Sequence, residues 1–171
     1  MNESEKLEKI IKEYNNEFPL NIVDICNKMG IIVQETVEFP DNVSGVIFKE
    51  NGNYYILVNK NHSIGRKSFT IAHELGHYIL HKDLLDKENE LVSYIKSKEN
   101  GKDYPILARG LEYNKRETEA NNFAAKILMP KNEFLKKCEE FQTIEEVAEY
   151  FGVSVVAASI RANVLGGWFY L

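Results

Sequence analysis

Residues 68–81 have the sequence Ser-Phe-Thr-Ile-Ala-His-Glu-Leu-Gly-His-Tyr-Ile-Leu-His, and we interpret the rest of the chain from this segment. It contains the pattern His73-Glu74-x-x-His77. Residues four apart lie on the same face of an α-helix, so the two imidazoles can bind one metal ion. Glu74 lies one step round the helix, where a carboxylate can take a proton from water that the metal polarises. The pattern therefore predicts a catalytic zinc site on a helix.

The surrounding residues predict a helix independently of this pattern. Ser68 can cap its start. Apolar side chains recur at helical spacing at Ile71, Leu75, Tyr78 and Ile79. Gly76 costs about 0.5–1 kcal/mol relative to alanine inside a helix, which suggests that another backbone or the metal site approaches closely here. The alternative is that the short pattern matches by chance. We favour the metal site over this alternative, because the motif and the helical periodicity agree.

The composition indicates a globular intracellular protein of one domain. The chain has 171 residues, 44% of them hydrophobic, and a formal net charge of −5. This acidity argues against a dedicated nucleic-acid binder and against an anionic membrane surface. Two cysteines make neither a disulfide framework nor a cysteine zinc cluster. The N-terminus lacks an apolar secretory core, and no apolar run approaches the ~20 residues of a membrane span. We therefore expect a cytoplasmic protein that does not enter a membrane.

The residues before the motif predict two helices and a small antiparallel sheet. The helices are expected at 5–18 and 21–29 and the strands at 31–37, 43–49 and 53–59. Asn51-Gly52 separates the last two strands and is the strongest short signal for a hairpin. A strand just before the metal-binding helix can form the edge of a cleft, to which an extended peptide adds as a further strand. The alternative is that the hairpin only covers the helix.

Two segments follow the motif. Residues 82–116 are largely polar and predict a surface excursion, with a lid over the site as the alternative. A second patterned helix begins at Lys115 and ends before Pro130. Its small buried residues Ala120 and Ala124 would let it pack closely, and the metal-binding helix is the expected neighbour.

The second helix offers the missing metal ligand. A catalytic zinc site usually has three protein ligands and one water, and no histidine follows His81 in the chain. A carboxylate should therefore complete the site, and Glu117 and Glu119 are the candidates. Glu117 lies on or beside the face of small buried residues, whereas Glu119 turns towards solvent, so we favour Glu117. For both, an acidic first turn that complements the helix dipole is the alternative. Asn121, four residues after Glu117, could hydrogen-bond to a ligand histidine.

Three further side chains are candidates around the site. His81 shares the face of the two motif histidines but lies about 6 Å further along the helix axis than His77. We therefore expect it to contact a ligand or line the cleft rather than bind the metal. Tyr104, Tyr113 and His81 could each stabilise the oxyanion of a reaction intermediate, and the sequence does not choose among them.

The two motifs together resemble the ImmA/IrrE family of metallopeptidases. The resemblance rests on residues 69–81 and 117–130 and covers about residues 20–166. It implies a zinc-dependent, gluzincin-like peptidase in which His73, His77 and Glu117 bind the metal and Glu74 is the catalytic base. Members of this family are often encoded on mobile elements or prophages, where they cut a helix-turn-helix repressor. The resemblance therefore implies that such a repressor is the protein substrate.

Residues 131–171 predict a helical tail. A capping box begins at Thr143, and Ser154 can cap a last helix. The pair of helices looks like a helix-turn-helix unit, but its second helix is mostly apolar and its neighbours are acidic. We therefore expect the tail to pack on the core or to dock a partner rather than to bind nucleic acid.

Together these observations predict an α+β fold with a small antiparallel sheet on a helical, zincin-like core. We expect one metallopeptidase domain over residues 1–171, with N-terminal helices at 1–30, the hairpin and metal-binding core at 31–130, and the helical tail at 131–171. Two other functions compete with a peptidase. One is a metal-bound regulatory or binding module that cleaves little, and the other is a DNA-binding regulator. Glu74 favours the enzyme, because metal binding alone needs no base at that position.

Overall fold

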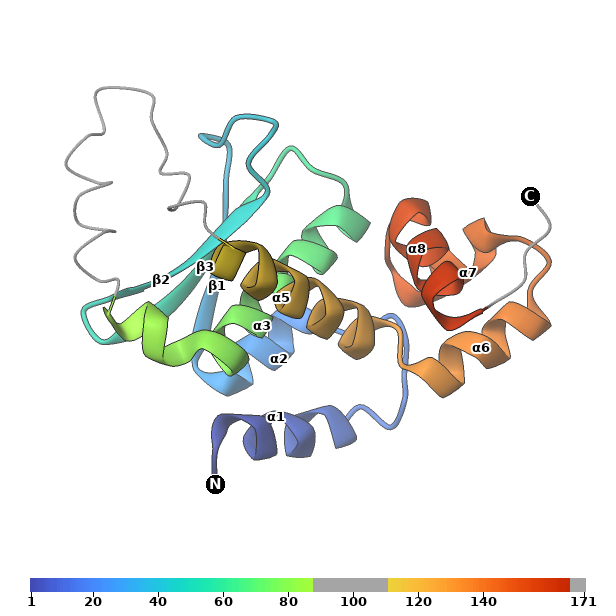
Figure 1. Ribbon diagram of the computed structural model, residues 1–171, viewed down its shortest axis with the longest axis horizontal. Coiled ribbons are helices and arrows are strands. Elements are labelled where there is room, and N and C mark those ends of the chain that lie inside the picture. The colour runs from blue at the N-terminus through green and yellow to red at the C-terminus, as the bar shows by residue number, and fades with distance from the viewer. Residues whose placement is uncertain (88–110, 167–171) are drawn as a thin grey trace.

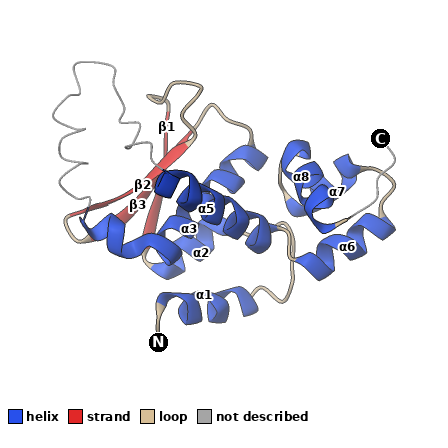
Figure 2. Ribbon diagram, in the orientation of Figure 1, coloured by secondary structure: helices blue, strands red, loops and turns tan. Residues whose placement is uncertain are grey.

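A three-stranded sheet lies beside the helix that carries the His-Glu-x-x-His pattern (Figure 1). The computed structural model describes residues 1–87 and 111–166, with only the backbone described at residues 111–114. The chain is an α+β protein, as predicted (Figure 2). The strands are β1 (Ile31–Thr36), β2 (Gly45–Glu50) and β3 (Asn53–Asn59).

The sheet is mixed, which corrects the prediction of a purely antiparallel one. Its strand order is β1-β3-β2. The hairpin strands β2 and β3 are antiparallel, whereas β1 runs parallel to β3. After β1 the chain forms β2 and then turns back as β3, which lies between β1 and β2. Strand β1 therefore pairs with the edge of β3 that β2 leaves free, and it runs in the same direction as β3. Propensity and alternation identify strands, but they do not select which edge a strand joins.

The edge of the sheet beside the motif helix belongs to β2, and no strand within residues 1–87 and 111–166 pairs with it, so we call it the open edge. The prediction that the strand just before this helix forms the edge is wrong, because that strand is β3, which lies in the centre of the sheet. The hairpin turn itself is as predicted. Asn51 and Gly52 have φ values of 49° and 83°, the left-handed conformations that a two-residue type I′ turn requires.

The motif lies in helix α3 (Ile64–Lys87), which begins earlier than predicted. Ser68 is inside the helix. The side chain of Ser63 accepts a hydrogen bond from the backbone of Arg66 at 3.4 Å, so the capping interaction lies five residues before the expected one. Near its other end the helix is interrupted at His81, whose φ of −130° and ψ of 23° are not helical.

Helix α5 (Leu111–Leu128) packs against α3. Ala120 and Ala124 are fully buried. A Cβ atom built on Gly76 would lie only 3.0 Å from the Phe123 ring and 3.3 Å from the backbone of Ala120. Glycine at this position therefore allows the close approach of a second helix that the sequence predicted.

The N-terminal helices are α1 (Glu3–Lys12) and α2 (Ile22–Met29). The first ends six residues before its predicted end, and Asn15 and Asn16 beyond it have positive φ values. The second has the expected bounds within one residue, an Asn21 cap and a left-handed Gly30. Of the helices in the two described ranges, none is both long and apolar enough to cross a membrane.

The C-terminal helices are α6 (Lys131–Glu140), α7 (Ile144–Phe151) and α8 (Val155–Leu165). They form a group beside the core (Figure 1). The predicted capping box at Thr143 and the Ser154 cap are present. The buried side chain of Arg161 in α8 donates its Nε–H to the carbonyl of Met129, at the end of α5, over 3.1 Å. The tail therefore packs on the core, as expected.

Candidate metal centre

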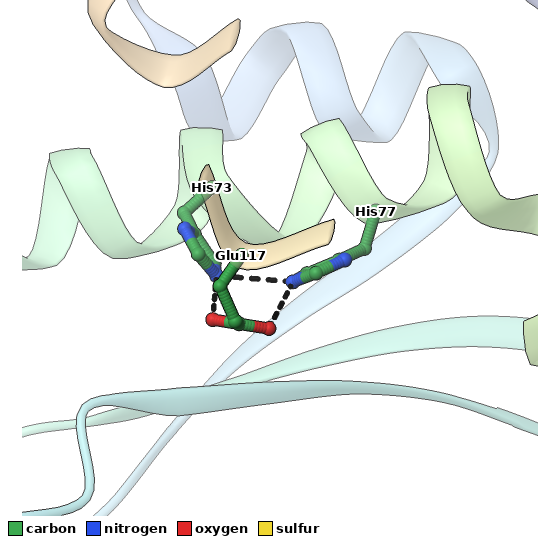
Figure 3. Close-up of side chains that lie close together, drawn as sticks. All are labelled: His73, His77 and Glu117. Atoms are coloured by element: carbon green, nitrogen blue, oxygen red, sulfur yellow. Dashed lines mark hydrogen bonds and ion pairs between the residues drawn. The ribbon is translucent and has the colours of Figure 1, made fainter. Parts of the chain in front are cut away.

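Three predicted ligand side chains meet between α3 and α5 (Figure 3). The Nε2 atoms of His73 and His77 are 3.0 Å apart. The carboxylate of Glu117 bridges them, with one oxygen 3.2 Å from His73 Nε2 and the other 3.1 Å from His77 Nε2. The imidazoles lie side by side because they are one turn apart on α3, and the close packing of α5 brings the carboxylate to them.

The donor set and its spacing fit a zinc ion. Bonds of about 2.0–2.1 Å in a tetrahedral site put neighbouring ligand atoms roughly 3.3–3.4 Å apart. The observed separations of 3.0–3.2 Å are close to this value. Within the described ranges, the group of His73, His77 and Glu117 is the one set of three such side chains arranged for a metal. Two histidines and one glutamate leave a fourth position free, which is the composition of a catalytic site.

The electrostatic environment keeps Glu117 in its ionised form. Hydrogen bonds from His73 and then from His77 hold the pKa of this carboxyl group well below its usual range, although partial burial opposes them. A carboxylate that is charged at neutral pH can bind a cation without first losing a proton.

Glu74 lies beside the cluster and is not part of it. Its side chain points between α3 and the sheet, and only 8% of the residue is exposed. Burial raises the pKa of its carboxyl group, against the opposing effect of the neighbouring His73. The backbone of Ile47 on β2 faces the same carboxyl group and favours its charged form. A buried carboxyl group with a raised pKa is typical of a general base or acid.

Each histidine of the cluster has a partner on its other ring nitrogen. Asn121 Oδ1 lies 2.8 Å from His73 Nδ1, so Asn121 contacts a ligand histidine as the sequence suggested. His77 Nδ1 lies 3.0 Å from His81 Nδ1. His81 therefore contacts His77 and lies outside the group of three side chains that could hold a metal ion. The opposite nitrogen of His81 is 2.9 Å from Glu119 Oε2.

Glu119 is the more exposed of the two carboxylates, as the sequence predicted, with 43% of its side chain exposed against 32% for Glu117. One of its oxygens nevertheless binds His81. Sequence reasoning missed this partner, although a histidine four residues after His77 and a second carboxylate near Glu117 were both visible. Tyr104 lies outside the described residues, and Tyr113 belongs to α5 at a position where only the backbone is described.

Comparison with known proteins identifies the family. A peptidase family model described as the IrrE N-terminal-like domain matches residues 26–163, which is most of the chain. The chain belongs to the ImmA/IrrE family. The resemblance inferred from the two motifs is therefore confirmed, and the family supports a metallopeptidase-like or regulatory role with a metal cofactor.

Individual relatives agree with this assignment. The chain is 25% identical over 166 residues to the metallopeptidase ImmA of Bacillus subtilis (strain 168), an alignment that covers 95% of this chain and 85% of that protein. Among solved structures, it is similar to a Mycobacterium tuberculosis transcriptional regulator, with a TM-score of 0.62 and 20% identity. That match covers 92% of this ImmA/IrrE chain but only 45% of the other one, and it shows a shared fold.

Proposed function

We propose that this ImmA/IrrE chain is a zinc-dependent endopeptidase that cleaves a protein substrate. The observation that carries the proposal is the triangle of two imidazole nitrogens and one carboxylate, with edges of 3.0–3.2 Å, beside the buried carboxyl group of Glu74. A site that only stored or sensed a metal would gain nothing from a buried acid at this position. Such an acid costs stability, since desolvation disfavours its charged form.

The proposed ligands are His73, His77 and Glu117, which hold the ion through Nε2, Nε2 and the carboxylate. A bound zinc ion would polarise the substrate carbonyl and lower the pKa of a coordinated water to about 7. Glu74 would accept the proton of the attacking water and then donate it to the leaving amine. The position of Glu74 next to β2 keeps its carboxyl group away from bulk water, which favours transfer of that proton within the site.

The open edge of β2 is suited to bind an extended segment of the substrate. The two-residue turn pairs Glu50 with Asn53, and a backbone hydrogen bond of 2.9 Å joins Asn59 to Ser44, so even-numbered residues of this strand bond to β3. In an antiparallel pair, the alternate residues direct their backbone groups the other way. These are the residues Gly45, Ile47 and Lys49, on the edge that faces Glu74. A substrate strand added here would run beside the catalytic base.

A helix-turn-helix repressor of a mobile element or prophage is the substrate that we propose. The support is the family resemblance carried by residues 69–81 and 117–130. The edge-strand arrangement adds a physical condition, because the scissile segment must be extended to pair with β2. We therefore expect cleavage in a linker or a locally unfolded segment of the repressor rather than within one of its helices.

Replacement of Glu74 by glutamine tests this function directly. Glutamine keeps the shape and hydrogen-bonding capacity of the side chain but removes its basicity. We expect the variant to fold, to bind one zinc per chain, and to cleave the candidate repressor roughly 10²–10⁴-fold more slowly, the usual contribution of a positioned general base. Zinc is measured by elemental analysis, and cleavage by gel electrophoresis and mass spectrometry. Glu145→Gln in α7 is the matched control, since Glu145 is exposed and lies outside the site.

The same variant separates a peptidase from a metal-bound binding module. If the chain acts by proteolysis, Glu74→Gln in cells leaves the repressor intact and the regulated genes silent. Full derepression by Glu74→Gln with an uncut repressor would refute the peptidase and establish the binding module in its place.

A further inference from the structure

His81 occupies an unusual position for a helical residue beside a metal site. Its backbone leaves the helical conformation, with φ −130° and ψ 23°, and its side chain is only 9% exposed. The ring lies between two partners, with Nδ1 3.0 Å from His77 and Nε2 2.9 Å from Glu119.

The chemistry of these partners sets the direction of both hydrogen bonds. Glu119 is a carboxylate at neutral pH and can only accept, so the Nε2 atom of His81 carries a hydrogen and donates it. A neutral imidazole with a hydrogen on Nε2 has an acceptor at Nδ1. The Nδ1 atom of His77 can then donate across the contact of 3.0 Å. A metal ion held by His77 Nε2, the atom that faces Glu117 and His73, would require this direction, because the ring then carries its hydrogen on Nδ1.

We infer that His81 and Glu119 form a relay that fixes the tautomer and the ring orientation of His77, so that its Nε2 lone pair points at the metal. The inference rests on the proposed metal site and adds two positioning residues to it. Metal-binding histidines commonly donate their second ring N–H to a carboxylate or carbonyl, and such partners strengthen binding. Here the carboxylate acts through a second histidine.

The other ligand histidine shows the same arrangement in a shorter form. Asn121 Oδ1 accepts from His73 Nδ1 at 2.8 Å, which leaves His73 Nε2 free for the metal. Asn121 and Glu119 both lie on α5, as does the ligand Glu117. Helix α5 therefore supplies a ligand, the outer partner of His73 and, through His81, the carboxylate at the end of the His77 contacts. His81 is needed as an intermediary because its ring spans the distance between Glu119 on α5 and His77 on α3.

Zinc affinity at constant pH tests the relay. We would measure zinc dissociation constants for purified full-length chains by competition with a chromophoric chelator. His81→Ala and Glu119→Ala should each weaken zinc binding by roughly 10–100-fold, the usual effect of removing such a partner. The double variant should be no weaker than His81→Ala, because Glu119 acts through that ring. His81→Gln, which keeps an acceptor for His77 Nδ1–H and a donor for Glu119, should recover part of the affinity.

The Nδ1–H of His77 provides a readout that a purely structural role would not change. In long-range ¹H–¹⁵N correlation spectra of the zinc-loaded chain, the Nδ1–H of the native His77 should exchange slowly with water, because His81 accepts its hydrogen bond. In Glu119→Ala and in His81→Ala this hydrogen should exchange faster. His62→Ala is the control for His81, since His62 bonds to the carbonyl of Asp41 outside the site, and Glu145→Ala is the control for Glu119.

Two results would overturn the inference. One is zinc affinity within twofold of the native value in Glu119→Ala, whose folding is checked by its melting temperature. The other is an exchange rate of the His77 Nδ1–H that is the same in the zinc-loaded native protein and in both variants. Failure of the metal site itself is distinguished by His77→Ala, which should abolish zinc binding whether or not the relay exists.

Discussion

Gly76→Ala probes how closely the metal site depends on the packing of α5 against α3. The added Cβ atom would lie 3.0 Å from the Phe123 ring and 3.3 Å from the backbone of Ala120, which is inside the 3.4 Å at which ordinary van der Waals contact begins. The ring can turn, but the Ala120 backbone can withdraw only if α5 moves. A shift of a few tenths of an ångström exceeds the tolerance of about 0.2 Å in metal–ligand distances. It would displace Glu117 and its neighbours together.

Two opposing effects set the size of the change. Alanine gains about 0.5–1 kcal/mol of helix propensity over glycine, while overpacking costs about 1–3 kcal/mol. We therefore expect Gly76→Ala to lower the free energy of unfolding by about 1 kcal/mol, or roughly 2–4 °C in melting temperature for a chain of this size. Zinc affinity should fall roughly tenfold, because α5 carries the ligand Glu117 together with Asn121, which contacts His73, and Glu119, which contacts His81. Chelator competition measures the affinity and urea unfolding of the metal-free chain measures the stability.

Gly65→Ala in the same helix is the matched control. Its Cβ atom would lie 2.7–2.8 Å from the backbone of Val153 and Ser154, at the turn between α7 and α8. It is eight residues from His73, or about 12 Å along the helix. This variant should lose stability without losing zinc affinity. A Gly76→Ala chain that gains the full helix propensity and binds zinc as tightly as the native chain would refute the dependence of the site on close packing.

Three further predictions concern reactivity, pH and helix capping. Burial raises the pKa of the Cys26 thiol to about 12, so iodoacetamide at pH 8 should modify Cys138 and spare Cys26 until the chain is unfolded, as mass spectrometry would show. The hydrogen bond from Lys49 lowers the pKa of Asp86 from its usual value of 3.8. A carboxyl group with a lowered pKa stabilises the fold at a pH above its unfolded-state pKa, and this stabilisation is lost as the pH falls through its folded-state pKa. Asp86→Asn should therefore be less stable than the native chain by up to about 1 kcal/mol at pH 7, and urea unfolding should show this difference shrink as the pH falls from the unfolded-state value through the lowered folded-state value. Thr143→Ala removes the capping box of α7 and should cost about 1 kcal/mol, seen as a melting temperature roughly 2–4 °C lower; an unchanged value would contradict the role of this cap.

Several local elements were predictable because neighbouring residues determine them. Asn51-Gly52 adopts the left-handed conformations that its residue types permit, and Gly30 ends α2 for the same reason. Thr143 forms its capping box with a residue three positions later. The start of α3 was placed wrongly because Ser63 and Ser68 are both plausible caps, and the choice depends on which turn packs against the rest of the protein.

The sheet shows where such reasoning ends. Each strand was recognisable from its own residues, yet the order β1-β3-β2 and the parallel pairing of β1 were not. Strand pairing joins residues that are distant in sequence, and β1 could have joined the free edge of β2 or that of β3 with the same side-chain pattern. The identity of the edge strand beside Glu74 follows from that choice.

In the metal centre, local sequence is enough to place the two histidines side by side, because residues four apart lie on the same face of one helix. It reduced the third ligand to two carboxylates. Only the tertiary structure brought Glu117 between the imidazoles and Glu119 against His81. Both placements depend on how closely α5 packs against α3. The contact between Gly76 and Ala120 sets the separation of the two helices, and these residues are 44 positions apart in the sequence.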